Sequence, residues 1–215
     1  MPEIPDDFLS DVPPDPVLGR FQAKDIVTVH LTACDLALAL HHADEACVGG
    51  KSAIFGDKAE RADNLKVNNQ VGQIVTLAGH LWLYGTDALY VQDRERQNQH
   101  KTTGDGGSDV GADSNIDFKG SLMKRSPDPL TYNLLVRPDE MHQDWVYVLG
   151  LVQYEGAQPL PNVFLVGWAS TDMLKFRYTD ATRFGGQGKV HAMHATDLRP
   201  LPPFRWPTRR PLRYI

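Results

Sequence analysis

Residues 104–121, GDGGSDVGADSNIDFKGS, bring together side chains whose types could do chemistry: Asp109, Asp117 and Lys119. Two carboxylates held close together repel each other by about 1 kcal/mol or more, depending on the local dielectric. A divalent cation reverses the sign of that interaction and turns the two carboxylates into a binding site. Because hard oxygen ligands suit Mg²⁺ or Mn²⁺, we expect one of these ions here.

The order Ile116-Asp117-Phe118-Lys119 predicts a strand that presents its two charged residues together. Successive side chains of a strand point to opposite faces, so Asp117 and Lys119 share one face while Ile116 and Phe118 enter the core. Asp109 stands eight residues before Asp117, and the intervening VGADSNI has the length and the turn residues of a hairpin loop. We therefore expect Asp109 to return alongside Asp117 at the edge of a cleft.

A metal ion held there could polarise a phosphoryl oxygen and lower the pKa of a bound water. Lys119 could orient that water or stabilise the negative charge on a pentavalent phosphate. These are the components that phosphodiester hydrolysis needs. Two structural alternatives stay open: Asp109 as an ordinary turn aspartate among glycines, and Asp117 with Lys119 as an ion pair on the exposed face of an edge strand.

The sequence predicts that two helices followed by a run of strands position these residues. Apolar residues recur at helical spacing over residues 32–47 and 68–84, and Gly85 is the expected stop of the second helix. The runs at 145–153 and 163–169 are continuously apolar, which is typical of strands covered on both faces. Further strands are predicted at 88–92, 116–119, 132–137 and 189–194, and Ser170 or Thr171 is expected to cap a short helix in TDMLKF.

Asp109, followed after eight residues by Asp117-Phe118-Lys119, resembles the D…(D/E)xK core of the PD-(D/E)XK nuclease superfamily. The order of elements is similar to that family: a helix, a hairpin carrying the motif, then further strands and a helix. The layout of DWVYVLGLV and VFLVGWAS after the motif is similar to that of small phage and bacterial nucleases of the superfamily, so the resemblance covers residues 68–200.

The resemblance implies an α/β fold with a restriction-endonuclease-like core, a central mixed sheet of about four to five strands flanked by helices. It implies that Asp109 and Asp117 bind Mg²⁺ (or Mn²⁺) and that Lys119 assists the attacking water. The family's acidic residue from the helix before the hairpin has no counterpart, because residues 68–84 contain no Asp or Glu. Gln73 is the expected substitute, with Gln70 second, and Ser108 stands where the family has proline.

Basic residues flank the motif and predict contacts with DNA phosphates. Such contacts hold a duplex without reading its sequence. A solvated loop is the alternative interpretation of this positive rim. The rim consists of Arg94, Arg96 and Lys101 before the motif, and of Lys124 and Arg125 after it.

The chain has 215 residues and a formal net charge of −5, so no global charge argument favours nucleic acid. We expect a Pro- and Asp-rich extension at 1–25, a nuclease-like domain at 26–200 and an Arg- and Pro-rich tail at 201–215. The first residues lack the apolar segment of a secretory signal, and no apolar run is long enough to cross a bilayer. We therefore expect a cytoplasmic protein of a bacterial or phage-infected cell, without a membrane partner.

The other histidines and the first cysteine are expected to be structural. His191 and His194 would lie on opposite faces of a strand, which argues against a shared metal, and His41 with His42 fits a polar helix face. His80 is expected in the core or at the surface, and Cys34 in the core. No GxxxxGK[ST] phosphate loop occurs, which argues against a P-loop NTPase.

These observations predict a metal-dependent DNA endonuclease, and the resemblance implies products with a 5′-phosphate and a 3′-hydroxyl. A homodimer would place one centre on each strand of a duplex. The first rival is a catalytically inactive protein of the same fold that binds nucleic acid or serves as a phage structural protein, which the missing helix acid favours. The second rival is an exonuclease, which a comparison of circular with linear DNA would distinguish.

Overall fold

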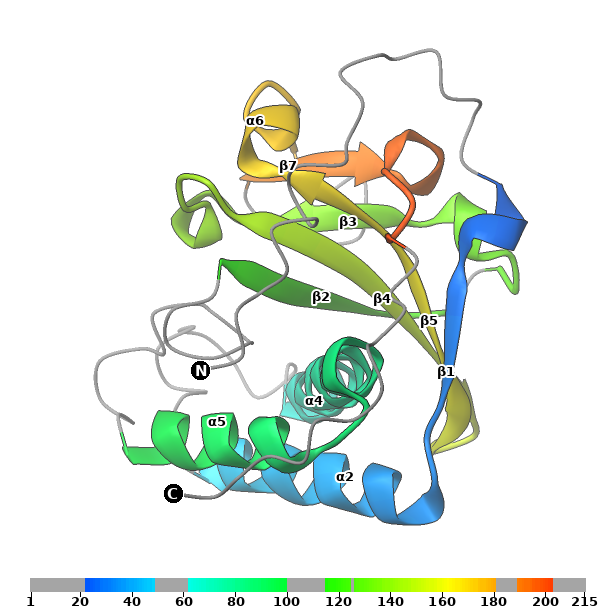
Figure 1. Cartoon of the computed structure of the whole chain (residues 1–215), viewed down its shortest axis with the longest axis vertical. Helices are drawn as coiled ribbons and strands as arrows, with labels where there is room; N and C mark the ends of the chain where they lie inside the picture. Colours follow the sequence, from blue (N-terminus) through cyan, green and yellow to red (C-terminus); the bar gives the residue numbers. More distant parts are fainter. Residues whose placement is uncertain (1–21, 49–61, 100–114, 125, 181–188, 203–215) are drawn as a thin grey trace.

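A four-stranded mixed sheet lies at the centre of the computed structural model, which describes residues 22–48, 62–99, 115–124, 126–180 and 189–202 (Figure 1). The sheet consists of β1 (Val27–His30), β2 (Ile116–Leu122), β4 (Val146–Glu155) and β5 (Gln158–Ser170), in the order β1-β5-β4-β2. β2 pairs with β4 in parallel, whereas β5 is antiparallel to both β4 and β1. The predicted mixed sheet with flanking helices is thus confirmed.

A smaller sheet covers one face of this central sheet (Figure 1). Its strands are β3 (Asn133–Val136), β7 (Lys189–His194) and β6 (Tyr178–Asp180), in the order β3-β7-β6, all antiparallel. Leu134 and Met193 from this sheet pack against Tyr147 and Leu149 of β4. Since helices cover the other face, β4 is buried on both sides, which explains its continuous apolar run.

Helices form the layer on the opposite face: α2 (Ala33–Val48), α4 (Ala62–Tyr84) and α5 (Ala88–Gln99). α4 lies directly on the sheet, and its buried side chains form one core with Ile116 and Phe118 of β2. At the close approach, a Cβ atom on Gly79 would stand 2.3 Å from the Phe118 ring, so only glycine fits there. Among the described residues, no helix has the length and apolar character needed to span a membrane.

The helix ends follow from local chemistry. Thr32 and Asp35 cap α2 reciprocally, since the Asp35 carboxylate accepts from Thr32 N at 2.7 Å and Asp35 N donates to Thr32 Oγ1 at 3.2 Å. Gly85 ends α4 with a φ of 66°, as predicted. Ser170 caps the short helix α6 (Thr171–Leu174) by accepting from Met173 N, which confirms the predicted cap.

Two expectations were wrong, and two strands were missed. Residues 88–92 are the first turns of α5 and not a strand. The buried face of this helix combines Tyr90 with the polar Asp93 and Arg94, so its apolar residues alone do not show the helical period. Cys34 is exposed on the first turn of α2. The strands β1 and β6 were not predicted.

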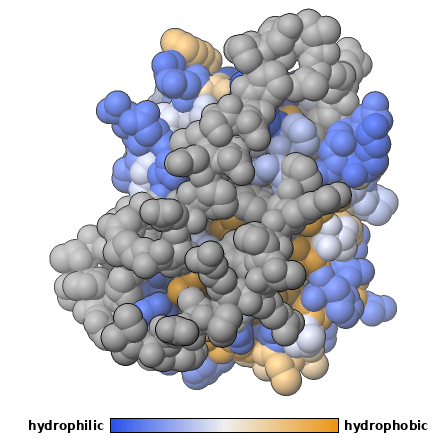
Figure 2. Space-filling view, viewed as in Figure 1, coloured by the Kyte–Doolittle hydropathy of each residue, from blue (hydrophilic) through white to orange (hydrophobic). Residues whose placement is uncertain are grey.

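Figure 2 shows hydrophilic side chains over much of the visible described surface beside the smaller sheet, and a hydrophobic patch at the top, over α6. Phe176, which follows α6, is 85% exposed. Most of the predicted extension at 1–25 and of the predicted tail at 201–215 lies outside the described part of the chain, which begins at residue 22 and ends at residue 202.

Candidate functional site

Strand β2 positions Asp117 and Lys119 on the face of the central sheet that the smaller sheet covers. Asp117 stands opposite Tyr147 on β4, and Lys119 stands opposite Leu149. Tyr147 and Leu149 belong to the core between the two sheets. Phe118 points the other way, against α4. The alternation predicted for this strand is therefore confirmed, with the charged pair on one face and the apolar pair on the other.

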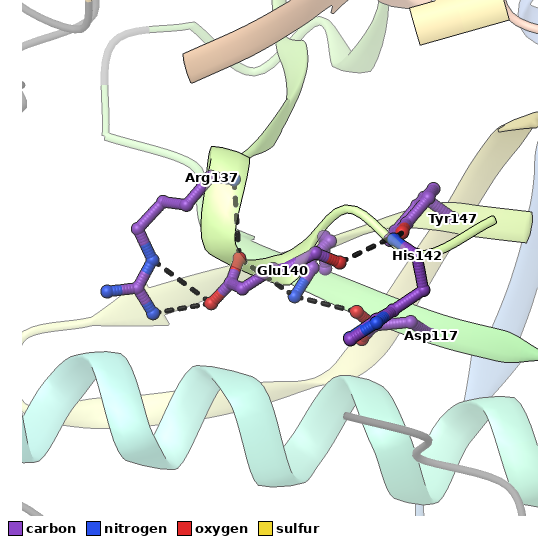
Figure 3. A network of polar contacts seen from close by, with 6 residues as sticks. Asp117, Arg137, Glu140, His142 and Tyr147 are labelled. Carbon is purple, nitrogen blue, oxygen red and sulfur yellow. Dashed lines mark hydrogen bonds and ion pairs between the residues drawn. The ribbon is translucent and has the colours of Figure 1, made fainter. Parts of the chain in front are cut away.

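Four residues form a chain of alternating charge at this place, which we call the strand-face cluster: Asp117, Lys119, Glu140 and Arg137 (Figure 3). Lys119 Nζ lies 2.7 Å from Asp117 Oδ2 and 3.1 Å from Glu140 Oε2. The Arg137 guanidinium forms an ion pair with the other carboxylate oxygen of Glu140. The side chains of Asp117 and Lys119 are 5% and 20% exposed, so the cluster is partly open to solvent through the lysine.

Glu140 is, together with Arg137, a member of the cluster that the sequence analysis missed. It ends a single 3₁₀ turn, Pro138–Glu140, which follows β3 and is capped by contacts between Arg137 and Glu140. Burial raises the pKa of the Glu140 carboxyl, but the charges of Lys119 and Arg137 and the hydrogen bonds from both outweigh it, and the pKa lies below its usual range. Glu140 is therefore a carboxylate at neutral pH.

A buried tyrosine holds the Glu140 turn in place. Tyr147 Oη donates to the Glu140 carbonyl oxygen at 2.9 Å and accepts from His142 N at 2.8 Å (Figure 3). Thr171 Oγ1 donates to the His142 carbonyl oxygen at 2.5 Å, which ties the same loop to α6. Burial raises the pKa of Tyr147, so this phenol keeps the proton that it donates. The position of the Glu140 carboxylate thus depends on β4 and α6 as well as on its own turn.

Gln73, the expected substitute for the helix acid, belongs to a second polar group in the helix layer. Its Oε1 accepts from Tyr90 Oη at 2.8 Å and from the Arg94 guanidinium at 3.4 Å. Nearby, His80 Nε2 contacts Asp93 Oδ2 at 3.1 Å. We call these five residues the helix-layer cluster. Since α4 covers the Phe118 face of β2, this cluster and the strand-face cluster lie on opposite sides of the sheet.

The structure therefore brings together Asp117 and Lys119 but places Gln73 elsewhere. Arg94, predicted to contact DNA from a surface rim, is 6% exposed and lies over the Tyr90 ring, because it fills the buried face of α5. Lys124 is exposed beyond the end of β2. Asp109, Lys101, Arg125 and the side chain of Arg96 lie outside the described residues.

The other predicted histidines have structural surroundings. His191 Nδ1 contacts the Leu174 carbonyl oxygen, and His194 is exposed and contacts Thr196. His80 is fully buried, as one of the two expectations for it stated. His42 packs edge-on against Tyr90 at 5.5 Å, so it lies between helices and not on a polar helix face.

The donor set for a metal is incomplete within the described part of the chain, where no group of three or more His, Cys, Asp or Glu residues is close enough to hold an ion. Asp117 and Glu140 do supply two carboxylates that contact the same nitrogen, Lys119 Nζ. Oxygen donors of this kind are the ligands that Mg²⁺ and Mn²⁺ prefer. The residues present therefore fit such an ion in chemical type. Comparisons with protein-family models, with curated proteins and with solved structures found no match to this chain.

Proposed function

We propose that this chain is a metal-dependent DNA endonuclease whose centre contains Asp117 and Lys119. The observation that carries the proposal is the direct contact between a carboxylate and an ammonium on one face of strand β2, with the Glu140 carboxylate at the same nitrogen. Phosphodiester hydrolysis needs oxygen ligands for a divalent cation beside a fixed positive charge, and this cluster supplies both kinds of group.

Asp117 and Glu140 are the described residues that would hold Mg²⁺ or Mn²⁺, and Asp109 is the further ligand that the sequence predicts. When bound, such an ion would polarise a phosphoryl oxygen and activate a water molecule. The charges of Lys119 and Arg137 keep Glu140 ionised, and the Tyr147 hydrogen bond keeps its turn in position. These contacts preorganise the carboxylate before any substrate arrives.

Lys119 is the residue that would stabilise negative charge on the phosphate. Its ammonium has two carboxylate partners, and its side chain is 20% exposed, so it can exchange one partner for a phosphate oxygen without leaving the cluster. As a flexible point charge, a lysine suits such an exchange. Lys124, exposed beyond the end of the same strand, would contact the DNA backbone without reading sequence.

A second candidate function is a non-catalytic nucleic-acid-binding protein of the same fold. The observation that favours it is that the charges of the strand-face cluster already compensate one another, with Asp117 almost fully buried against Lys119. Such a self-satisfied network can be structural. An exonuclease is the alternative within the enzyme class, and it would leave circular DNA intact.

Cleavage of supercoiled plasmid with Mg²⁺, Mn²⁺ or EDTA tests the proposal. We expect metal-dependent nicking or linearisation, and a loss of at least about a hundredfold in rate for Lys119→Ala and Asp117→Asn. Lys189→Ala is the matched control, because it removes a lysine from another strand-borne Lys–Asp pair, with Asp180 at 3.7 Å, and should keep the full rate.

The outcomes separate the three candidates. Cleavage of linear but not circular DNA would replace the endonuclease by an exonuclease. No cleavage of plasmid, linear duplex, single-stranded or branched DNA with either metal would overturn the nuclease and leave the binding protein. Equal rates for Lys119→Ala and Lys189→Ala would show that the strand-face cluster is not the centre.

A further inference from the structure

A groove of about 770 Å³ lies where β2 ends, beside the hairpin formed by β4 and β5. One of its walls comes from helices α2 and α4 and includes Leu40 and Gln70. The other wall comes from residues 122–124, at the end of β2 and just after it, and from the hairpin residues 156–159. Among the described residues that line the groove, none belongs to the strand-face cluster or to the helix-layer cluster. The groove is therefore a separate feature of the molecule.

Part of the lining is apolar and belongs to the edge of the core. Leu40, Val67 and Leu122 are half-buried and pack against the core between the helices and the central sheet, as Tyr154 of β4 does. Tyr154 Oη donates to Gln70 Oε1 at 3.3 Å, and burial raises the pKa of Tyr154, so the phenol keeps the proton that it donates. A ligand that covered these side chains would gain from the apolar surface removed from water.

The charged part of the lining is positive and donates hydrogen bonds. Lys66 lies on the helical wall and Lys124 on the opposite wall, beyond the end of β2. Because the amide oxygen of Gln70 accepts from Tyr154, the polar group that Gln70 can still offer is its amide nitrogen, which is a donor. Among the described lining residues, none is an aspartate or a glutamate. Such a lining selects ligands that carry negative charge and accept hydrogen bonds.

The present partner of Lys66 can be exchanged at little cost. Lys66 Nζ lies 3.1 Å from Asp44 Oδ1, and the two side chains are 55% and 57% exposed. A pair with this exposure contributes little to stability, so the ammonium can turn to a bound anion. Lys124 is also exposed. Two ammonium groups on different walls are thus available to one acidic group.

We propose that this groove binds a small organic anion, a carboxylate or phosphate group on an apolar body. Sites for such molecules measure about 300–1,000 Å³ and combine apolar lining with a few polar groups, and a volume of 770 Å³ falls in this range. The acidic group would contact Lys66 and Lys124, and the body would cover Leu40, Val67 and Leu122. A phosphate of a DNA backbone could reach Lys124, but it has no apolar part for the helical wall. The site does not depend on nuclease activity.

Two fluorescent dyes test the groove: 1-anilinonaphthalene-8-sulfonate and its uncharged counterpart N-phenyl-1-naphthylamine. They share the same rings and differ by the sulfonate, which stands in for the acidic group of the ligand. Titration of the full chain gives a dissociation constant for each dye. Lys66→Gln and Lys124→Gln should each weaken binding of the sulfonate roughly threefold to fivefold, and the double variant about tenfold or more. The uncharged dye should bind all these proteins equally, because it makes only the apolar contacts.

A variant that adds a charge gives an independent test. Gln158 is an exposed lining residue, and Gln158→Glu puts a carboxylate in the groove with almost no change of shape. It should weaken the sulfonate roughly threefold to fivefold and leave the uncharged dye unchanged. Lys189→Gln is the control, because Lys189 is 54% exposed and pairs with Asp180, as Lys66 does with Asp44, but lies on the smaller sheet. It should change neither dissociation constant.

Competition identifies the acidic group and the rival ligand. Displacement of the sulfonate dye by 1-naphthoate or by 1-naphthyl phosphate would support the proposal and show which acidic group the groove accepts. Displacement by acetate or inorganic phosphate at the same concentration would show a simple ion site and overturn it. Displacement by a short single-stranded oligodeoxynucleotide in EDTA, but by neither naphthyl acid, would assign the groove to DNA and overturn it too. So would sulfonate binding that is the same in the wild type, the double variant and Gln158→Glu.

Discussion

The two polar clusters of the molecule lie on opposite faces of one sheet and differ in their access to solvent. In the helix-layer cluster, the side chains of His80 and Asp93 are 0% and 10% exposed. In the strand-face cluster, Lys119 and Glu140 are 20% and 27% exposed. The groups of a sealed polar cluster must be satisfied within the protein, as His80 is by Asp93 and by the Thr76 carbonyl oxygen. A partly open one can exchange a partner for a substrate. This difference in access is the reason why the proposed function uses the second cluster and not the first.

The largest expected effect on stability comes from breaking the helix-layer cluster. Asp93→Ala leaves His80 Nε2 buried without its carboxylate, and we expect the free energy of unfolding to fall by about 3 kcal/mol. Asp197→Ala is the control, because its pair with Arg177 is nearly half exposed and should contribute less than about 1 kcal/mol. Urea denaturation measures both. Equal losses would mean that solvent access does not separate the two kinds of pair.

A smaller effect should come from the contact that separates the two clusters. Gly79→Ala forces the Phe118 ring to move, which should cost about 1–3 kcal/mol of stability and, because Phe118 lies between Asp117 and Lys119, should also lower activity. In Gly72→Ala, on the same helix, the new methyl group meets nothing within 4 Å, and stability should rise by about 0.5–1 kcal/mol. Thermal unfolding and plasmid cleavage of the two variants give the comparison. A stable, fully active Gly79→Ala protein would show that α4 does not constrain the strand-face cluster.

The smallest effect concerns the pH dependence of the strand-face cluster. Because the pKa of Glu140 is lowered below 4.5 in the folded protein, its contribution to stability is present above that pH and is lost as the pH falls through the folded value. The stability difference between the wild type and Glu140→Gln should therefore shrink on acidification below pH 4.5. Denaturation curves across this range measure it. A difference that grows on acidification would contradict the ion pairs described for Glu140.

Much of the sheet could be predicted because strand patterns are local. The apolar runs of β4 and β5 and the alternation in β2 depend only on which faces are covered, and all three were found. α5 was missed because its buried face includes Asp93 and Arg94, whose burial depends on partners in α4. β1 was missed because its four residues, VTVH, are too few to show a pattern.

The candidate site could be predicted only where it depends on the local pattern of a strand. The period of a strand is enough to place Asp117 beside Lys119. Glu140 reaches them only because the smaller sheet packs over the central one, and no spacing in the sequence records that packing. For Gln73, the sequence predicts its place on α4 but not the face of the helix from which its side chain projects. That side chain contacts α5 and not the strand-face cluster.

The pairing of the strands also has a consequence for the order of folding. β4 and β5 are consecutive and form a hairpin, whereas β1 must close a loop that brings Val27 opposite Leu165. Closing a longer loop costs more chain entropy, and contacts between distant residues slow folding. β2 joins β4 across a much shorter stretch, pairing Asp117 with Tyr147. We therefore expect Asp117, Lys119 and Glu140 to assemble early, around the hairpin, and the amino-terminal strand to complete the sheet last.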